Sequence, residues 1–324
     1  MTDGMTDGMT NGNQDLVPEV VFGLDAVKAA PSAVSIGFFD GVHRGHQTII
    51  KRAVRHAEAH GLRSVVVTFD RHPMEVIAPG SEPPMLMTRE RRAQTLASQG
   101  VDLVVMLPFT DELRHLSAEE FVDHILAGSL QADRVVVGAN FRFGHKAAGD
   151  VAMLTDLGPM RGFTAEGVTL LELDGVVISS TEIRGAVERG EVELASRMLG
   201  RPHLVEGVVV RGDQRGADLG FPTVNLQVDR RIAVPARGVY AGMAHLPDGR
   251  TCMAATNVGV NPTFDGSEMR VEAYLLDFDE DLYGCHVAVD FRHRLRDEVR
   301  FESVDALVVQ MHKDVALARE LLAV

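Results

Sequence analysis

Apolar and polar positions follow two kinds of pattern over the first 200 residues. Short valine-rich runs without polar alternation predict buried strands at residues 33–37, 64–69, 101–106 and 134–138. The segments 45–60 and 88–98 carry apolar residues at helical spacing, and Ser117 with Glu120 has the form of a capping box that begins another helix. Buried strands separated by helices favour a parallel sheet covered on both faces. Such sheets bind ligands beyond the carboxyl ends of their strands.

The pattern changes near residue 200, where the apolar runs become short and are separated by Gly, Pro, Asp and Asn. Such runs occupy residues 208–210, 239–245, 271–276 and 287–291. Pro247-Asp-Gly249 is a hairpin turn signal, so this half is predicted to be a small antiparallel β-barrel. An amphipathic helix is expected from Ser303 to Leu322.

These patterns divide the chain into an α/β unit at 17–190 and a barrel unit at 191–324. Residues 1–16 repeat Met-Thr-Asp-Gly and contain almost nothing to bury, so we expect them to form a disordered tail.

Charge and cysteine content restrict the partners. Lys and Arg total 32 while Asp and Glu total 46, and the resulting net charge of −14 argues against binding of nucleic acids or anionic membranes. Cys252 and Cys285 are too isolated for a disulfide scaffold or a zinc module. We see neither an apolar run long enough for a membrane-spanning helix nor a secretory signal, and therefore expect a cytoplasmic protein.

The segment Gly37-Phe-Phe-Asp-Gly-Val-His-Arg-Gly-His46 runs from the first predicted strand into the first helix. Its glycines allow the backbone to approach a ligand closely, and the helix N-terminus presents free N–H groups to a phosphate. His43 and His46 can face the same cleft, where two imidazoles suit the negative charge that develops on a reacting phosphate. A zinc-binding pair and ordinary loop histidines are the alternatives.

Two further segments also follow predicted strands. Phe69-Asp-Arg-His-Pro73 is explained as well by a turn as by a site. Within the segment 138–144, Asn140 could bond a phosphate or a ribose, and Phe141 or Phe143 could line a pocket for an aromatic ligand. We expect one of these two phenylalanines to belong to the core.

A fourth segment, Ile178-Ser-Ser-Thr-Glu-Ile-Arg184, begins a predicted helix. Ser179 and Glu182 have the spacing of a capping box. Capping does not account for the neighbouring Ser180, Thr181 and Arg184. Hydroxyl groups and a guanidinium at a helix N-terminus favour a phosphate site.

In the barrel half, a glycine-punctuated loop runs into Phe-Pro-Thr-Val-Asn225. No lysine stands in a Gly-Lys-Ser/Thr sequence, so this is not a Walker A loop. Thr223 and Asn225 alternate along an extended segment, so both face one way, and their oxygens suit Mg²⁺ that carries nucleotide phosphates. A long hairpin loop is the alternative. Glu272 is either a solvated strand residue or, if it faces the barrel mouth, a base for an alcohol.

Taken together, in this order and in these halves, the motifs resemble those of the prokaryotic bifunctional riboflavin kinase/FMN adenylyltransferases, or FAD synthetases. The resemblance covers nearly the whole chain after the tail. It rests on Gly37–His46, Gly138–Gly144, Ser179–Arg184 and Gly220–Asn225, with further matches at Gly238–Tyr240, Asn257–Gly259, Pro262-Thr263 and Leu282–Gly284. It implies a Rossmann-like nucleotidyltransferase domain followed by a riboflavin kinase β-barrel with a C-terminal helix.

The resemblance also implies two reactions and their catalytic groups. In the barrel, Glu272 would act as the base on the riboflavin 5′-hydroxyl, which attacks the γ-phosphate of ATP, while Thr223 and Asn225 hold Mg²⁺. In the first half, the phosphate of FMN would attack the α-phosphate of a second ATP and release pyrophosphate. His43 and His46 would stabilise that transition state.

The remaining expected contacts are assigned by the same resemblance. Those of the adenylyltransferase with ATP are Gly37, Phe39, Asp40, Gly45, Asn140, Ser180, Thr181 and Arg184, of which Asp40 has the least defined role. Those of the kinase with ATP and flavin are Gly212, Gly216, Gly220, Phe221, Pro222 and Asn257. The product FAD would pass to apo-flavoproteins, and the oligomeric state is left open.

Three positions depart from the usual family pattern. Arg71 replaces a proline, and Glu182 and Ala217 stand where arginine is common. These changes could alter ATP affinity or closure of the flavin pocket, but we expect both activities. The alternatives are a chain in which only the kinase module is active and a flavin-binding regulatory protein without turnover. A nucleotidyltransferase for pantetheine phosphate or glycerol phosphate would leave the barrel half unexplained.

Overall fold

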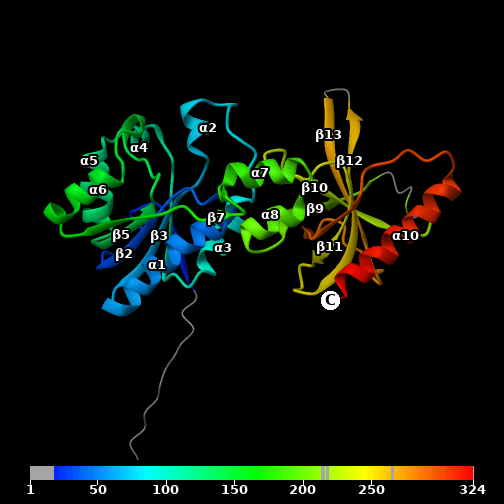
Figure 1. The fold of residues 1–324 in the computed structure, drawn as a ribbon, viewed down its shortest axis with the longest axis horizontal. Helices are drawn as coiled ribbons and strands as arrows, with labels where there is room; N and C mark the ends of the chain where they lie inside the picture. Colours follow the sequence, from blue (N-terminus) through cyan, green and yellow to red (C-terminus); the bar gives the residue numbers. More distant parts are fainter. Residues whose placement is uncertain (1–17, 213–215, 217–218, 264–265, 324) are drawn as a thin grey trace, which may run out of the picture.

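The computed structural model describes residues 18–212, 216, 219–263 and 266–323. Two units lie side by side, with the helices α7 (Ser180–Glu188) and α8 (Val192–Leu199) between them (Figure 1). The α/β class of the first unit and the antiparallel barrel of the second confirm the prediction. The boundary at residue 190 stays a prediction, and the predicted tail lies outside the described residues. In the part of the chain that the structure describes, no helix is long and apolar enough to span a membrane.

The first unit is built on a parallel sheet of six strands in the order β1-β4-β3-β2-β5-β6. The strands are β1 (Glu19–Phe22), β2 (Ser32–Ile36), β3 (Arg63–Phe69), β4 (Leu103–Leu107), β5 (Ala132–Gly138) and β6 (Thr164–Val168). The four predicted strands are the four central ones. The edge strands β1 and β6 escaped prediction because the apolar run Val20–Phe22 of β1 is short and mostly exposed, and because Glu166 and Gly167 interrupt β6.

Helices cover both faces of this sheet. On one face lie α1 (Arg44–His60) and α3 (Arg89–Ala97), and on the other lie α5 (Ala118–Phe121), η2 (Val122–Ser129) and α6 (Val151–Leu157). The predicted capping box of Ser117 and Glu120 is formed at α5. Shorter elements are η1 (Asp40–Val42), α2 (Pro73–Ile77), α4 (Asp111–His115), η3 (His145–Ala147), η4 (Gly158–Arg161), β7 (Glu172–Leu173) and β8 (Val176–Val177).

Neighbouring residues of one strand enter different cores, which explains the continuous apolar runs. Val65 and Val67 of β3 pack in the same cluster as Ile125 of η2. Val66 between them packs in the cluster of Ile50 from α1.

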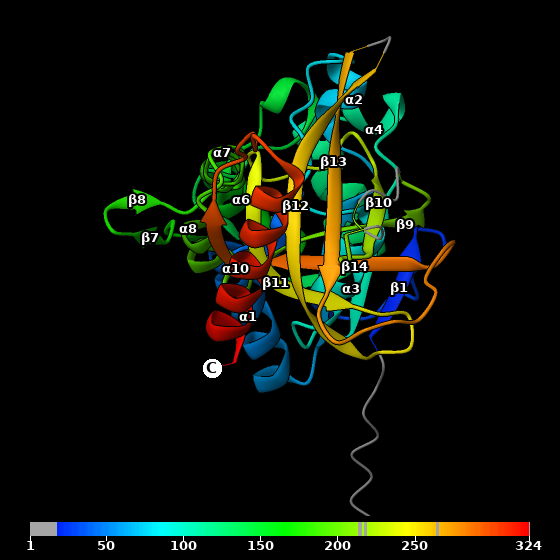
Figure 2. The ribbon, with the colours of Figure 1, turned by 90° about the vertical axis from the view of Figure 1, so that its right-hand side faces the viewer.

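The second unit is a closed antiparallel barrel in the order β12-β13-β10-β9-β14-β11, in which β11 returns to β12 and β15 joins β11 from outside. Its strands are β9 (His203–Val210), β10 (Thr223–Val228), β11 (Gly238–His245), β12 (Thr251–Thr263), β13 (Gly266–Leu275), β14 (His286–Phe291) and β15 (His293–Arg296). Leu226 and Ala273 belong to the core inside the barrel. Ala255 points outward and packs with Ala318 of α10 (Val304–Leu322), which lies across the outer wall (Figure 2).

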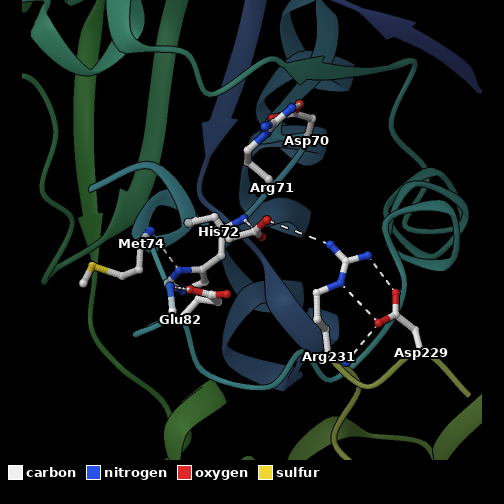
Figure 3. A network of polar contacts seen from close by, with 9 residues as sticks. Asp70, Arg71, His72, Met74, Glu82, Asp229 and Arg231 are labelled. Carbon is white, nitrogen blue, oxygen red and sulfur yellow. Dashed lines mark hydrogen bonds and ion pairs between the residues drawn. The ribbon is translucent and has the colours of Figure 1, made fainter. Parts of the chain in front are cut away.

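The two units are joined by backbone contacts as well as by α7 and α8. Met85 and Ile232 form a parallel bridge: the N–H of Met85 donates to the carbonyl of Arg231 (2.6 Å), and the N–H of Ala233 donates to the carbonyl of Met85 (2.8 Å). Beside it, the guanidinium of Arg231 bonds Asp229 at 2.7 Å and lies 3.9 Å from the carboxylate of Glu75 (Figure 3). The junction therefore fixes one unit against the other.

Candidate active sites

Three of the segments singled out in the sequence leave the same edge of the parallel sheet. Because β3, β2 and β5 are neighbours, the loops at 37–46, 69–73 and 138–144 lie side by side at the carboxyl ends of these strands. The N-terminus of α7 reaches the same place, where the hydroxyl of Ser180 donates to the carbonyl of Asp40 at 2.9 Å. Residues far apart in the sequence thus assemble into one candidate site.

The loop between β2 and α1 has an unusual backbone. Phe39, Gly41 and Val42 have φ values of 55°, 77° and 40°, which are left-handed. This conformation costs a non-glycine residue roughly 1–2 kcal/mol. A Cβ atom at position 41 would in addition lie 2.7 Å from Cδ1 of Leu86. Strain of this kind persists only where the surroundings hold it, and it is concentrated at functional sites.

Asp40 holds this loop in place. Its buried carboxylate accepts hydrogen bonds from the backbone N–H of Leu86 (3.0 and 3.1 Å) and from Arg184 (2.8 Å). Burial raises the pKa of Asp40, and the charge of Arg184 opposes that rise. Asp40 therefore connects residues 37–43 between β2 and α1, called the motif loop from here on, to α7. Through Leu86 it also connects this loop to the junction between the two units.

His43 and His46 stand at the N-terminus of α1 with their rings stacked, 3.5 Å between centroids. Nδ1 of His43 accepts a hydrogen bond from the backbone N–H of His46 (3.3 Å), which leaves the ring proton on Nε2. Burial lowers the pKa of His43 to about 4, assisted by Arg201 and Arg184. Burial, assisted by His43, holds the pKa of His46 well below its usual value. Both imidazoles are therefore neutral near pH 7 and offer N–H groups rather than positive charge.

The other expected phosphate contacts surround this pair. A Cβ atom at Gly45 would lie 3.1 Å from the ring of His43 and 3.7 Å from the carbonyl of Ile178, so the N-termini of α1 and α7 converge here. Ser179 caps α7 by accepting from the N–H of Glu182 (3.2 Å), which is half of the predicted capping box.

Three residues of the expected contact set lie at the periphery of the pair. At Gly37, a Cβ atom would meet the ring of Phe39 at 2.9 Å. Asn140, in the loop after β5, and Thr181, in the first turn of α7, are exposed.

A mostly apolar cavity of about 810 Å³ lies at the loops that follow β3 and β5, and its described lining includes neither His43 nor His46. Its lining includes five phenylalanines, namely Phe69, Phe109, Phe121, Phe141 and Phe143. Phe143 is buried in the core of the sheet and Phe141 is half-buried with its ring stacked on that of Phe143, so one of the pair is a core residue, as expected. In the 69–73 segment, His72 caps α2, which confirms the turn, and Pro73 lines this cavity, while the role of the segment in a site stays a prediction.

The second candidate site is a row of polar side chains across three strands of the barrel. Asn225 of β10 pairs with Glu272 of β13, which pairs with Asn257 of β12. Directly opposite residues share a face of the sheet, and Thr223 lies on the same face because it is two positions from Asn225. Val224, Leu226 and Ala273, at the alternate positions, contact the barrel core. Glu272 therefore points out from the wall rather than into the barrel mouth.

A cavity of about 310 Å³ covers most of this row. Thr223, Asn257 and Glu272 form its polar floor, and Met311 of α10 and the loop after β15 form its roof. Glu272 lies 3.0 Å from Arg270, with about a quarter of each side chain exposed. The C-terminal helix thus makes a substrate-sized pocket out of an open sheet face.

The glycine loop approaches this row closely. A Cβ atom at Gly212 would lie 2.5 Å from the amide of Asn225, and one at Gly216 would lie 2.5 Å from the carbonyl of Phe221. Gly220 has a φ of 84°, Phe221 is buried against His312 of α10, and Pro222 is exposed. Asp213–Arg215 and Ala217, a position that departs from the family pattern, lie outside the described residues.

Asn225 has the chemistry of a ligand for a hard cation. Its Oδ1 is buried and has no hydrogen-bond partner among the residues that the structure describes. Leaving such an oxygen unpaired costs roughly 1–3 kcal/mol, which a bound cation would recover. This unpaired oxygen fits Mg²⁺, which prefers oxygen ligands.

Three residues near the first site were missed by sequence reasoning. Gln47 and Arg201 bond carbonyl groups of the motif loop. Arg92 is 1% exposed, stacks 4.2 Å from the ring of Phe38 and donates to the carbonyl of Phe69; burial lowers its pKa to about 10. Arg92 lies in a run of four charged residues, and such a run predicts a solvent-exposed surface rather than a buried side chain.

The other two departures from the family pattern, Arg71 and Glu182, are exposed. Arg71 pairs with Asp70 at 3.0 Å and borders the junction between units rather than the apolar cavity. Glu182 is exposed in the first turn of α7.

Comparison with known proteins places the same two activities on the same two halves. A family model described as FAD synthetase matches residues 26–182, and one described as riboflavin kinase matches residues 199–322. A Pseudomonas fluorescens protein named bifunctional riboflavin kinase/FMN adenylyltransferase is 42% identical over 290 residues, which are 89% of this chain and 92% of that protein. An Escherichia coli protein of the same name is 34% identical over 309 residues, which are 93% and 97% of the two chains.

The fold is also found among solved structures. A crystal structure of a Streptococcus pneumoniae protein, described as a macrolide-efflux protein, matches with a TM-score of 0.85 and 32% identity. The match covers 94% of this chain and 99% of that one, so both units and their connection are shared.

Proposed function

The chain belongs to the bifunctional riboflavin kinase/FMN adenylyltransferase family, and we propose that its two reactions take place at the two sites described above. It phosphorylates riboflavin to FMN and adenylylates FMN to FAD with release of pyrophosphate, using ATP in both steps. One observation supports this assignment. The candidate residues around His43 and His46 come from the unit that matches FAD synthetase, and the row of Asn225, Asn257 and Glu272 comes from the unit that matches riboflavin kinase. This pattern disfavours a chain with only one working module.

At the kinase site, Glu272 is the proposed general base. It accepts the proton of the riboflavin 5′-hydroxyl while that oxygen bonds the γ-phosphorus of ATP, and the bond from this phosphorus to ADP breaks. An alcohol is a poor nucleophile near pH 7, so a positioned base contributes roughly 10²–10⁴-fold. Glu272 lines the cavity and is only partly covered, and Arg270 holds its carboxylate at 3.0 Å.

Mg²⁺ is the proposed cofactor of the kinase, held by Thr223 and Asn225. The unpaired Oδ1 of Asn225 supports this role. Two protein oxygens suffice because Mg²⁺ keeps water and nucleotide phosphates as its other ligands. When bound, the ion neutralises charge on the ATP phosphates. Gly212, Gly216 and Gly220 let the backbone approach those phosphates closely.

At the adenylyltransferase site, no general base is needed because the phosphate of FMN is already ionised. One of its oxygens bonds the α-phosphorus of ATP, and the bond from this phosphorus to pyrophosphate breaks. His43 and His46 donate N–H groups to the oxygens that gain charge, assisted by the converging N-termini of α1 and α7. Asn140, Thr181 and Arg184 contact the ATP, and the phenylalanine-lined cavity takes the isoalloxazine ring.

Two variants test this division. His46→Ala should lower FAD formation from FMN by roughly 10²–10³-fold while riboflavin phosphorylation persists. Glu272→Gln should lower FMN formation by roughly 10²–10⁴-fold while supplied FMN is still adenylylated. His60→Ala, an exposed histidine on the same helix, and Glu280→Gln, an exposed glutamate of the same barrel, are the matched controls. Loss of both products in either folded variant would contradict separate sites.

The same assignment carries finer expectations. We propose that riboflavin phosphorylation stops when Mg²⁺ is chelated and returns when it is restored. We also propose a cytoplasmic location, where apo-flavoproteins take up the FAD.

A further inference from the structure

Arg201 lies on the segment that leads from α8 into β9, yet it bonds the motif loop of the first unit. Its Nη2 donates to the carbonyl of Gly41 (2.6 Å) and its Nη1 to that of Val42 (3.2 Å). Burial lowers the pKa of Arg201 to about 10, so it remains a cation near pH 7. Arg201 is half-buried, and a charge partly removed from water must be compensated, which the loop carbonyls do here.

The same contacts tie the motif loop to the end of α8. Nε2 of Gln47 donates to the carbonyls of Val42 and Leu199, both at 2.9 Å, and Nη1 of Arg201 lies 3.5 Å from the carbonyl of Leu199. The last carbonyls of a helix attract cations. The other end of α8 is anchored in the barrel, because Val192 packs in the barrel core.

We propose that Arg201 is a positioning residue for FMN adenylylation, supplied from the kinase side of the chain. This inference rests on the proposed roles of His43 and His46. Gly41 and Val42 are the left-handed residues directly before His43, so their carbonyl contacts set where α1 begins and where the imidazoles stand. A displacement of about 1 Å at a catalytic group can cost roughly 10²-fold in rate.

The charge of Arg201 has a second effect on the same histidine. The charged and titratable groups that face His43 are Arg201 from the segment after α8, Arg184 from α7 and His46 from α1. Both arginines disfavour a proton on His43. A neutral side chain at position 201 should therefore raise the pKa of His43.

The test uses the full-length enzyme with Arg201→Met and Arg201→Lys. Arg197→Met is the matched control, because Arg197 is an exposed residue of α8 that pairs with Asp174 at 2.7 Å. We expect Arg201→Met to lower kcat for FAD formation by about 10²-fold with little change in KM. Arg201→Lys, which keeps the charge but not the two-pronged donor, should fall between Arg201→Met and wild type. Riboflavin phosphorylation should persist in all three variants and serves as the internal control for folding.

Two outcomes would overturn the proposal. One is FAD formation at the wild-type rate in Arg201→Met. The other is a parallel loss of both activities, which would make Arg201 a structural residue. NMR titration of His43, assigned with His43→Gln, adds a readout independent of turnover. An unchanged pKa of His43 in Arg201→Met would contradict the proposed effect of the Arg201 charge on this histidine.

His43→Ala separates this proposal from the site assignment. If His43→Ala still forms FAD normally, the assignment of the histidines fails whatever Arg201→Met does. If only Arg201→Met stays active, the role of Arg201 fails alone.

Discussion

The two proposed catalytic sites differ in how deeply their charged side chains are buried. In the adenylyltransferase site, Asp40 and Arg184 are 1% and 9% exposed, and their ion pair also holds a strained loop. In the kinase site, Arg270 and Glu272 have side chains 27% and 25% exposed, on the outer wall of a barrel whose core lies on the other side. Similar substitutions should therefore cost stability as well as activity at the first site, but mainly activity at the second.

Asp40→Ala should have the largest effect on stability. It leaves Arg184 as a buried charge without a partner and removes the acceptor for the N–H of Leu86, which together cost roughly 3–5 kcal/mol. Urea unfolding of the first unit measures this loss. Asp40→Asn, which keeps an acceptor oxygen, should cost less, and Glu272→Gln should change the free energy of unfolding by no more than about 0.5 kcal/mol. Equal losses at Asp40 and Glu272 would remove the contrast between the sites.

Acidification should weaken the first unit through His43. The pKa of this residue is about 4 in the folded chain against an ordinary value of 6.5. Between these values the unfolded chain binds more protons, so the stabilisation is complete above pH 6.5 and is lost as the pH falls towards 4. From pH 7 to pH 5 the free energy of unfolding should fall by about 2 kcal/mol from this residue. Urea unfolding of His43→Gln should show a correspondingly weaker pH dependence; identical dependence would refute this.

A pair of glycines compares the two loops directly. Gly41 and Gly220 have φ values of 77° and 84°, but a Cβ atom at position 41 meets Leu86 at 2.7 Å, whereas one at position 220 meets no atom of the described residues within 4 Å. Gly220→Ala should therefore cost only the left-handed conformation, roughly 1–2 kcal/mol. Gly41→Ala should cost more, in unfolding free energy and in FAD formation. A larger loss for Gly220→Ala would show that the loop of the kinase site is the more tightly packed one.

Arg270→Met should have the smallest effect on stability. A partly exposed ion pair contributes under about 1 kcal/mol, so the unfolding free energy of the barrel should hardly change. Arg184→Met, at the buried pair, is the comparison and should destabilise its unit several times more. Thermal unfolding of the two variants measures this difference. A similar fall in the unfolding free energy of both variants would mean that the depth of burial does not distinguish the two sites.

Local signals explain why the fold and most candidate residues could be predicted. The central strands are continuous apolar runs, and the histidine segment follows one of them at the spacing of a helix start. The contacts that hold that segment are not local: the partners of Asp40 lie 46 and 144 residues away, and Arg201 lies 160 residues from Gly41. No periodicity reports such pairs.

Orientation was harder to predict than position. For Glu272 the sequence left open a solvated strand position and the barrel mouth, because alternation along a strand shows that a residue faces away from its neighbours but not what covers it. The covering helix α10 lies about 40 residues further along the chain. The burial of Arg92 was not predicted, because a run of four charged residues indicates a solvent-exposed helix surface and gives no sign that one of them is buried.

The bridge between Met85 and Ile232 bears on how this gene can be divided. A polypeptide that ends at residue 190 would lack the backbone partners of Met85, the helix α8 and the guanidinium that holds Gly41. A lineage that split the two activities onto separate genes would have to evolve replacements for these contacts, or keep the two products bound to each other. The proposed kinase row of Asn225, Asn257 and Glu272 is drawn from the barrel strands β10, β12 and β13, so a separate kinase chain would retain it.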